Sequence, residues 1–191
     1  LPTDLSAEAG GLFYLAGGYK YAMAGEGACF LHAPPGFGPR PEITGWFAEF
    51  GALEGRAEGV AYAEGGMRFM GSTFDPSGLY RMLAVRRMLA GEGLDTAAIA
   101  AHVEPLRAGL AGRIAAGDMG ALGEAERLHP NPTGPQPRFL ALRDPRAGLW
   151  AKKLAEQGVI VDSREDILRI GIGLYHDRAD LDALGVAAAR L

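Results

Sequence analysis

Residues 12–32 read LFYLAGGYKYAMAGEGACFLH, which is two short apolar runs on either side of a glycine-rich segment. The first run, 12–16, ends at a pair of glycines, and the second, 28–32, ends shortly before Pro34. Neither run alternates strictly between apolar and polar residues, a pattern typical of strands covered on both faces. We therefore expect two buried strands of one sheet, with Cys29 buried as a small apolar side chain.

The rest of the chain divides into a loop-rich part and a helix-rich part. Residues 34–41 hold four prolines and two glycines, which predicts an irregular loop. Apolar residues at helical spacing predict a helix that ends at Gly91. A second helix, ending near Gly117, is predicted by residues that step by 4, 3, 4 and 4 positions: Ile99, Val103, Leu106, Leu110 and Ile114. A proline-rich linker is expected at 118–137.

The C-terminal part predicts a small α+β layer domain. Asp144 and Asp177 each stand where a helix N-cap is expected, and Gly158 stands where the first of these helices would end. The expected order is strand, helix, two strands and a final helix, at 138–143, 145–157, 159–161, 167–170 and from 178 onward.

Composition and charge exclude several classes of protein. The 191 residues are 48% hydrophobic and 22% charged, with a net charge of −4 and no block of basic residues, which argues against nucleic-acid or membrane-surface binding. The apolar runs are shorter than the roughly 20 residues of a membrane-spanning helix. One cysteine excludes an internal disulfide, and the histidines lack metal-ligand spacing, so we expect no metal. We expect a cytoplasmic protein.

Lys20 is the lysine whose position indicates chemistry. It follows the first apolar run and lies between two tyrosines, whereas Lys152 and Lys153 fall on an expected helix with a solvated face. An amine at the end of a buried strand is partly desolvated and is a candidate nucleophile toward a carbonyl group. The structural alternative is a lysine that extends from a sheet edge into solvent.

Four motifs follow one another along the chain. They are Gly18–Tyr21 with the glycine-rich turn behind it, Gly45–Phe47, Arg68–Thr73, and Asp162–Arg164 continuing through Arg169 to Leu174 and Tyr175. In this order and at this spacing they resemble the fold-type I pyridoxal-phosphate enzymes of the class V aminotransferase family, and kynureninases most closely. The resemblance spans essentially the whole chain.

The resemblance implies a role for five residues. Lys20 would bind the aldehyde of pyridoxal 5′-phosphate covalently and move protons. Tyr19, Trp46 and Thr73 would bind the cofactor phosphate. Arg169 would bind the α-carboxylate of an amino-acid substrate, for which a bidentate guanidinium is suited.

Structural alternatives stand beside these roles. Trp46 is also a suitable anchor for the proline-rich loop, and Thr73 a turn residue. Arg169, between Leu168 and Ile170, would point away from its apolar neighbours and into solvent. Arg164 is the second candidate for the carboxylate and otherwise forms a surface salt bridge.

The resemblance also implies an α/β and α+β organisation. Residues 1–75 would be the end of the cofactor-binding large domain, 76–91 a connecting helix, and 92–191 a small C-terminal α+β domain. Because the cofactor lysine lies near the middle of such enzymes, the chain, which starts at Leu1, is expected to be their C-terminal half. Such enzymes form homodimers that share the active site between subunits. The fragment alone is expected to bind the cofactor weakly and to be inactive.

The reaction stays open at this point. Hydrolytic C–C cleavage of a kynurenine-like substrate is the first hypothesis and transamination the second. Ala48 and Glu49, and then Phe74–Pro76, depart from the kynureninase pattern in regions expected near the substrate side chain. A third hypothesis is a non-catalytic fragment that only dimerises or binds a partner.

Overall fold

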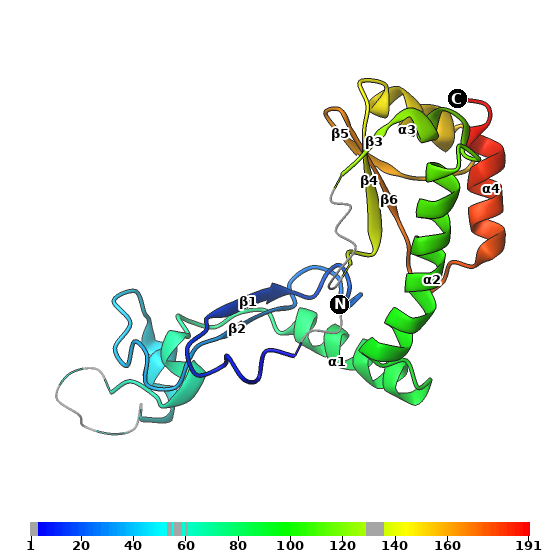
Figure 1. Ribbon diagram of the computed structural model, residues 1–191. Coiled ribbons are helices and arrows are strands. Elements are labelled where there is room, and N and C mark those ends of the chain that lie inside the picture. The colour runs from blue at the N-terminus through cyan, green and yellow to red at the C-terminus, as the bar shows by residue number, and fades with distance from the viewer. Residues whose placement is uncertain (1–3, 53–54, 56–58, 60, 129–135) are drawn as a thin grey trace. The chain divides into compact units, whose positions relative to one another are not determined.

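Two small antiparallel sheets and four α-helices form a mixed α/β fold in the computed structural model, which describes residues 4–52, 55, 59, 61–128 and 136–191 (Figure 1). These residues form two compact units, 4–93 and 94–191. We call them the N-terminal unit and the C-terminal unit and describe each by itself. Within the described part of the chain, no helix is both long and apolar enough to cross a membrane.

The N-terminal unit is built on a two-stranded sheet. Its strands β1 (Tyr14–Gly17) and β2 (Cys29–His32) pair antiparallel, with Tyr14 opposite His32 and Gly17 opposite Cys29. Residues 34–41 form no helix or strand, as the prolines predicted. Two 3-10 helices and one α-helix follow along the chain: η1 (Trp46–Ala52), η2 (Gly65–Phe69) and α1 (Ser77–Gly91).

The two strands form where the apolar runs predicted them, but the prediction that they are buried is wrong. Leu15 is 75% exposed and Phe30 is 49% exposed, and Cys29 is exposed as well. No third strand or helix layer covers the sheet among the described residues of this unit. Among the described residues of this unit, the buried apolar side chains are small ones: Ala24, Ala28, Pro34 and Ala48.

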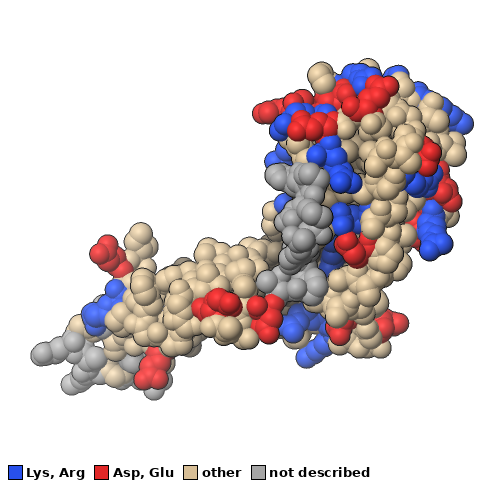
Figure 2. Space-filling view, viewed as in Figure 1, with Lys and Arg blue, Asp and Glu red and all other residues tan. Residues whose placement is uncertain are grey.

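Large apolar side chains therefore remain open to solvent across the N-terminal unit. On the face drawn in Figure 2, charged residues gather over the C-terminal unit, while the N-terminal unit presents mostly uncharged ones. A monomer exposes single apolar residues routinely, but so many large exposed side chains within one unit favour an interaction surface. The exposed set includes Phe13, Tyr14, Leu15, Phe30, Leu31, Phe37, Ile43, Trp46, Phe50, Phe74 and Tyr80.

The C-terminal unit has a four-stranded antiparallel sheet in the order β3-β4-β6-β5. The strands are β3 (Glu126–Arg127), β4 (Phe139–Arg143), β5 (Asp162–Arg164) and β6 (Ile167–Gly171). The helices are α2 (Thr96–Ala115), α3 (Ala147–Ala155) and α4 (Arg178–Ala188), with the 3-10 helix η3 (Gly120–Glu124) between α2 and β3.

One apolar core joins the sheet and the three helices of this unit. Alternate residues of the two central strands point into it, since Leu140 pairs with Ile170 and Leu142 with Leu168. Each helix buries an apolar stripe in the same core: Ile99, Val103, Leu110 and Ile114 of α2, Trp150 and Leu154 of α3, and Leu181 and Leu184 of α4. The helices therefore cover one face of the sheet. The expected Asp177 cap is confirmed, because its carboxylate accepts from Ala179 and Asp180 N–H.

Two predicted elements of this unit differ in the structure. The strand expected at 159–161 starts later, at Asp162, because the N–H of Val159 still donates to the Leu154 carbonyl at 2.9 Å as α3 ends. The linker expected at 118–137 contains η3, whose Leu122 is fully buried, and β3. Three of its prolines lie outside the described residues.

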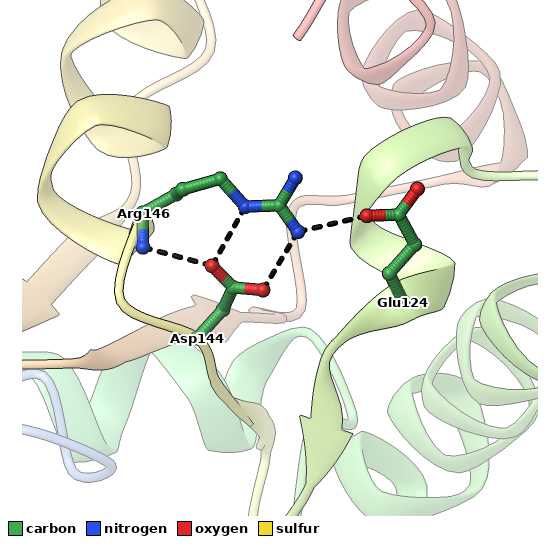
Figure 3. A network of polar contacts seen from close by, with 3 residues as sticks. All are labelled: Glu124, Asp144 and Arg146. Atoms are coloured by element: carbon green, nitrogen blue, oxygen red, sulfur yellow. Dashed lines mark hydrogen bonds and ion pairs between the residues drawn. The ribbon is translucent and has the colours of Figure 1, made fainter.

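The helix predicted to start at 145 starts at Ala147. The Asp144 carboxylate does not cap the helix but accepts hydrogen bonds from Arg146, in the turn just before it (Figure 3). Its Oδ1 accepts from the backbone N–H and from Nε of Arg146, each at 2.8 Å, and its Oδ2 accepts from Nη2 at 2.8 Å. The same Nη2 donates to Glu124 Oε2 at 2.8 Å, and the guanidinium lies 4.7 Å from the Trp150 ring centroid. The bonds from Arg146 lower the pKa of Asp144 to about 2, and the bond to Glu124 connects the start of α3 to η3.

We expect Asp144→Asn to make the stability of the protein less dependent on acid. The folded-state pKa of Asp144 lies below its ordinary value of 3.8, so its stabilisation is present above about pH 4 and is lost as pH falls toward about 2. The free energy of unfolding in urea, measured at several pH values between about 5 and 2, should fall less steeply for the variant. Asp118→Asn, at an exposed carboxylate, is the control and should keep the wild-type slope. Equal slopes for all three proteins would contradict the assignment.

Candidate functional site

Lys20 lies on a short closed loop between the two strands of the N-terminal unit. The N–H of Gly18 donates to the Ala28 carbonyl at 2.6 Å, and the N–H of Met23 donates to the Lys20 carbonyl at 2.9 Å. The side chain is exposed, and its Nζ lies 5.2 Å from the ring centroid of Tyr19. The expected desolvation of Lys20 within this chain is therefore wrong, because the strand before it is not buried.

Trp46 opens η1 and belongs to an aromatic cluster. Its ring centroid lies 4.5 Å from that of Phe47 and 5.7 Å from that of Phe50, and half of its surface stays exposed. These ring contacts lie within η1 and hold the indole in place, but they do not test the structural alternative, in which Trp46 anchors the proline-rich loop. The exposed fraction also leaves the ring open to a ligand.

The segments that carry Trp46 and Thr73 meet each other through their backbones. The N–H of Phe47 donates to the Gly71 carbonyl at 3.4 Å, and a Cβ at Gly45 would collide with that same carbonyl. Glycine at position 45 is therefore required by close approach. Thr73 is exposed two residues beyond the contact. The structure thus brings two of the expected phosphate-binding segments together.

Arg68 is a residue of this unit to which the sequence assigned no role. It is 5% exposed and donates to four backbone carbonyls. Nε donates to Gly38 at 3.1 Å, Nη2 to Phe37 at 2.6 Å and to Pro34 at 3.3 Å, and Nη1 donates to Gly65. One guanidinium therefore fastens the proline-rich loop to the start of η2. The Arg68–Thr73 motif of the sequence included this residue but did not predict that it binds backbone carbonyls.

Arg169 lies on β6 with its side chain on the sheet face opposite the helices. Its neighbours Leu168 and Ile170 are buried in the core, while Arg169 forms an ion pair with Asp162 of β5, directly across the strands. Nε of Arg169 is buried and has no hydrogen-bond partner among the described residues. The guanidinium therefore keeps donor capacity beyond the Asp162 pair. Arg164, the second candidate, is exposed on β5.

The donor set of these residues fits two parts of pyridoxal phosphate. An exposed primary amine suits an aldehyde, and an indole N–H and hydroxyl groups suit a phosphate. Lys20, Tyr19, Trp46 and Thr73 all belong to the N-terminal unit and are all exposed. Arg169 belongs to the C-terminal unit. No group of three or more potential metal ligands occurs among the residues that the structure describes.

Comparisons with known proteins found little. No protein-family model and no curated protein matches the chain. A solved structure titled as a NIFS-like protein is 16% identical and aligns with a TM-score of 0.45 over 69% of this chain. The chain spans 38% of the length of that protein. A likeness of this strength assigns neither a family nor an activity to the chain.

We expect Arg68→Lys to release the proline-rich loop, because an ammonium group cannot donate to all four carbonyls at once. Chymotrypsin cleavage after Phe37, followed by mass spectrometry, should become about tenfold faster, as expected when a hydrogen bond from a charged donor is lost. Arg87→Lys, at an exposed arginine of α1, is the matched control and should leave the rate unchanged. An unchanged rate in Arg68→Lys would show that other contacts hold the loop.

Proposed function

We propose that this chain carries the cofactor-lysine segment and the small C-terminal domain of a pyridoxal-phosphate enzyme that acts on an amino acid. In this proposal residues 1–75 are the end of a large cofactor-binding domain, 76–91 connect, and 92–191 form the small domain. The observation that carries it is the backbone contact between the Gly45 and Gly71 segments. It supports a shared phosphate site because it joins two motifs that lie well apart along the chain.

The roles of the residues follow from their chemistry. When bound, pyridoxal phosphate supplies an aldehyde that condenses with amines and a ring that withdraws electrons from the substrate α-carbon. Lys20 would hold the aldehyde carbon through its Nζ and carry a proton to and from the substrate. The phenol of Tyr19, the indole N–H of Trp46 and the hydroxyl of Thr73 would donate to the phosphate.

Arg169 would bind the α-carboxylate of the substrate. Its bond to Asp162 supports this role, since a guanidinium fixed on one side presents its other edge in a defined direction. The same Asp162 lowers the net charge of the site, which favours a substrate with both a carboxylate and an ammonium group over a dianion.

Hydrolytic cleavage of a C–C bond in a kynurenine-like substrate is our first choice of reaction, on the strength of the motif resemblance. Transamination is the second, and one observation favours it. Glu49, where the sequence leaves the kynureninase pattern, accepts from the Ala61 N–H at 2.5 Å. Its carboxylate thus closes a loop of the backbone, so this position contributes to folding in place of contacting an aryl substrate.

The exposed apolar surface of the N-terminal unit supports an assembly. We propose that it is covered in the complete enzyme by the remainder of the large domain and by a second subunit of a homodimer that shares the active site. A dimerising fragment without catalytic activity is the competing hypothesis. The intact mass of the protein isolated from its source separates them, since a mass about twice that of this chain favours the enzyme.

Lys20→Ala tests the cofactor assignment. The protein isolated from its source, mixed with pyridoxal phosphate, should develop the visible absorbance band of the lysine-bound cofactor, and the same protein with Lys20→Ala should not. Lys152→Ala, at an exposed lysine of α3, is the control and should keep the band. With kynurenine added, anthranilate should form. A band that survives Lys20→Ala would reject the assignment, and transamination without anthranilate would select the second reaction.

Arg169→Lys tests the carboxylate site. A lysine loses the two-pronged contact, so the KM for the amino acid should rise about tenfold or more, while kcat changes less. Steady-state kinetics with the protein isolated from its source measure both constants. Arg164→Lys, two residues from Asp162 on the neighbouring strand, should leave the KM near the wild-type value. The reverse outcome would assign the carboxylate to Arg164.

A further inference from the structure

The loop that carries Lys20 has a second limb of small residues, Ala24–Ala28, whose shape depends on glycine. Gly25 and Gly27 have φ angles of +69° and +84°, in the left-handed region where a side chain is strained. Ala24 and Ala28 are 0% and 1% exposed, although much of the surrounding surface is open. The limb is therefore covered by another segment of the N-terminal unit.

Arg81 of helix α1 lies against this limb. Its Nε donates to the Ala24 carbonyl at 2.6 Å, and its Nη2 donates to the Glu26 carbonyl. A Cβ at Gly25 would be 2.8 Å from Nε, so the guanidinium lies directly over the glycine between the two acceptors. The planar guanidinium can bond two carbonyls that stand two residues apart, which a lysine ammonium cannot match.

The first turn of α1 makes a second close contact with the limb. Gly78 is buried, and a Cβ there would lie 2.6 Å from the carbonyl carbon of Gly27. The helix backbone and the loop backbone therefore touch without intervening side chains. Together with the Arg81 bonds, this contact fixes the limb to the helix at Ala24, Glu26 and Gly27.

Because Ala24 and Lys20 belong to one hydrogen-bonded loop, the Arg81 bond that holds Ala24 also restrains the backbone of Lys20. The N–H of Ala24 donates to the Gly18 carbonyl at 2.9 Å, and the N–H of Met23 donates to the Lys20 carbonyl at 2.9 Å. We propose that Arg81 is a positioning residue that holds the Lys20 loop against α1, so that the Lys20 amine and the phosphate donors address one cofactor molecule. This inference rests on the proposed function.

The test measures how strongly Lys20 prefers an aldehyde that carries a phosphate. The protein isolated from its source is labelled with pyridoxal phosphate or with pyridoxal and reduced with borohydride, and the adducts are quantified by peptide mass spectrometry. Lys152, which is exposed in the other unit, serves as the internal reference amine. Arg81→Lys should lower the phosphate preference of Lys20 relative to Lys152 by about tenfold, the change expected for one lost bond from a charged donor. If Arg81→Lys only frees the Lys20 loop, Lys20 would still be labelled, but it would no longer prefer pyridoxal phosphate to pyridoxal.

The control and a second measurement decide every outcome. Arg87→Lys on the same helix should keep the preference within about twofold of wild type. Hydrogen exchange of the β1 and β2 amides should be the same in Arg81→Lys as in wild type. An unchanged preference overturns the inference, and a loss accompanied by faster exchange throughout both strands overturns it too, since Arg81 would then only stabilise the unit. If the wild-type protein isolated from its source shows no phosphate preference at Lys20, the proposed function is rejected, and the inference with it.

Discussion

Hydrogen bonds from guanidinium groups to backbone carbonyls hold the N-terminal unit together. The buried apolar side chains among its described residues are three alanines and Pro34, so hydrophobic burial gives little of the stabilisation that a core normally supplies. Arg68 binds four carbonyls of two loops, and Arg81 binds two carbonyls of a third. Since an irregular loop leaves its carbonyls without strand or helix partners, a side chain with five donors is well suited to satisfy them.

The C-terminal unit is stabilised in a different way. Leu142, Trp150, Leu154 and Leu168 are at most 1% exposed and belong to one core shared by the sheet and its helices. Polar contacts in this unit mostly join segments at its surface, as Arg146 does by donating to both Asp144 and Glu124. This division suits the proposed roles, in which Lys20 and Thr73 on loops and Trp46 on η1 would bind a cofactor and Arg169 on a strand would bind a carboxylate.

The sequence predicted the helices of this protein better than the burial of its strands. Ile99 to Ile114 recur at a spacing that only a helix brings onto one face, and that face is buried in α2. Val159, Ile160 and Val161 are strong strand formers, but the end of α3 holds the first of them, and the pairing with β6 starts at Asp162. The runs at 12–16 and 28–32 predicted strands correctly and burial wrongly, because burial depends on what lies over a sheet and a local pattern does not contain that.

For the candidate site, motif order pointed to Lys20, Trp46, Thr73 and Arg169. Arg68 and Arg81 gave no such signal, since their carbonyl acceptors lie 30 or more residues away in most cases.

The self-contained core of residues 94–191 has a consequence for synthesis on the ribosome. Its sheet is formed by strands of residues 126–171, with β4 paired to β6 across the intervening α3 and β5, so the sheet needs no strand from the N-terminal unit and can form once this unit has emerged. The N-terminal unit emerges earlier and exposes Leu15, Ile43 and Tyr80 while the later part is still being made. Within these 191 residues, the segment that exposes large apolar side chains is therefore synthesised before the segment that forms the packed core. A holdase chaperone bound to the nascent chain would find its binding sites in residues 4–93.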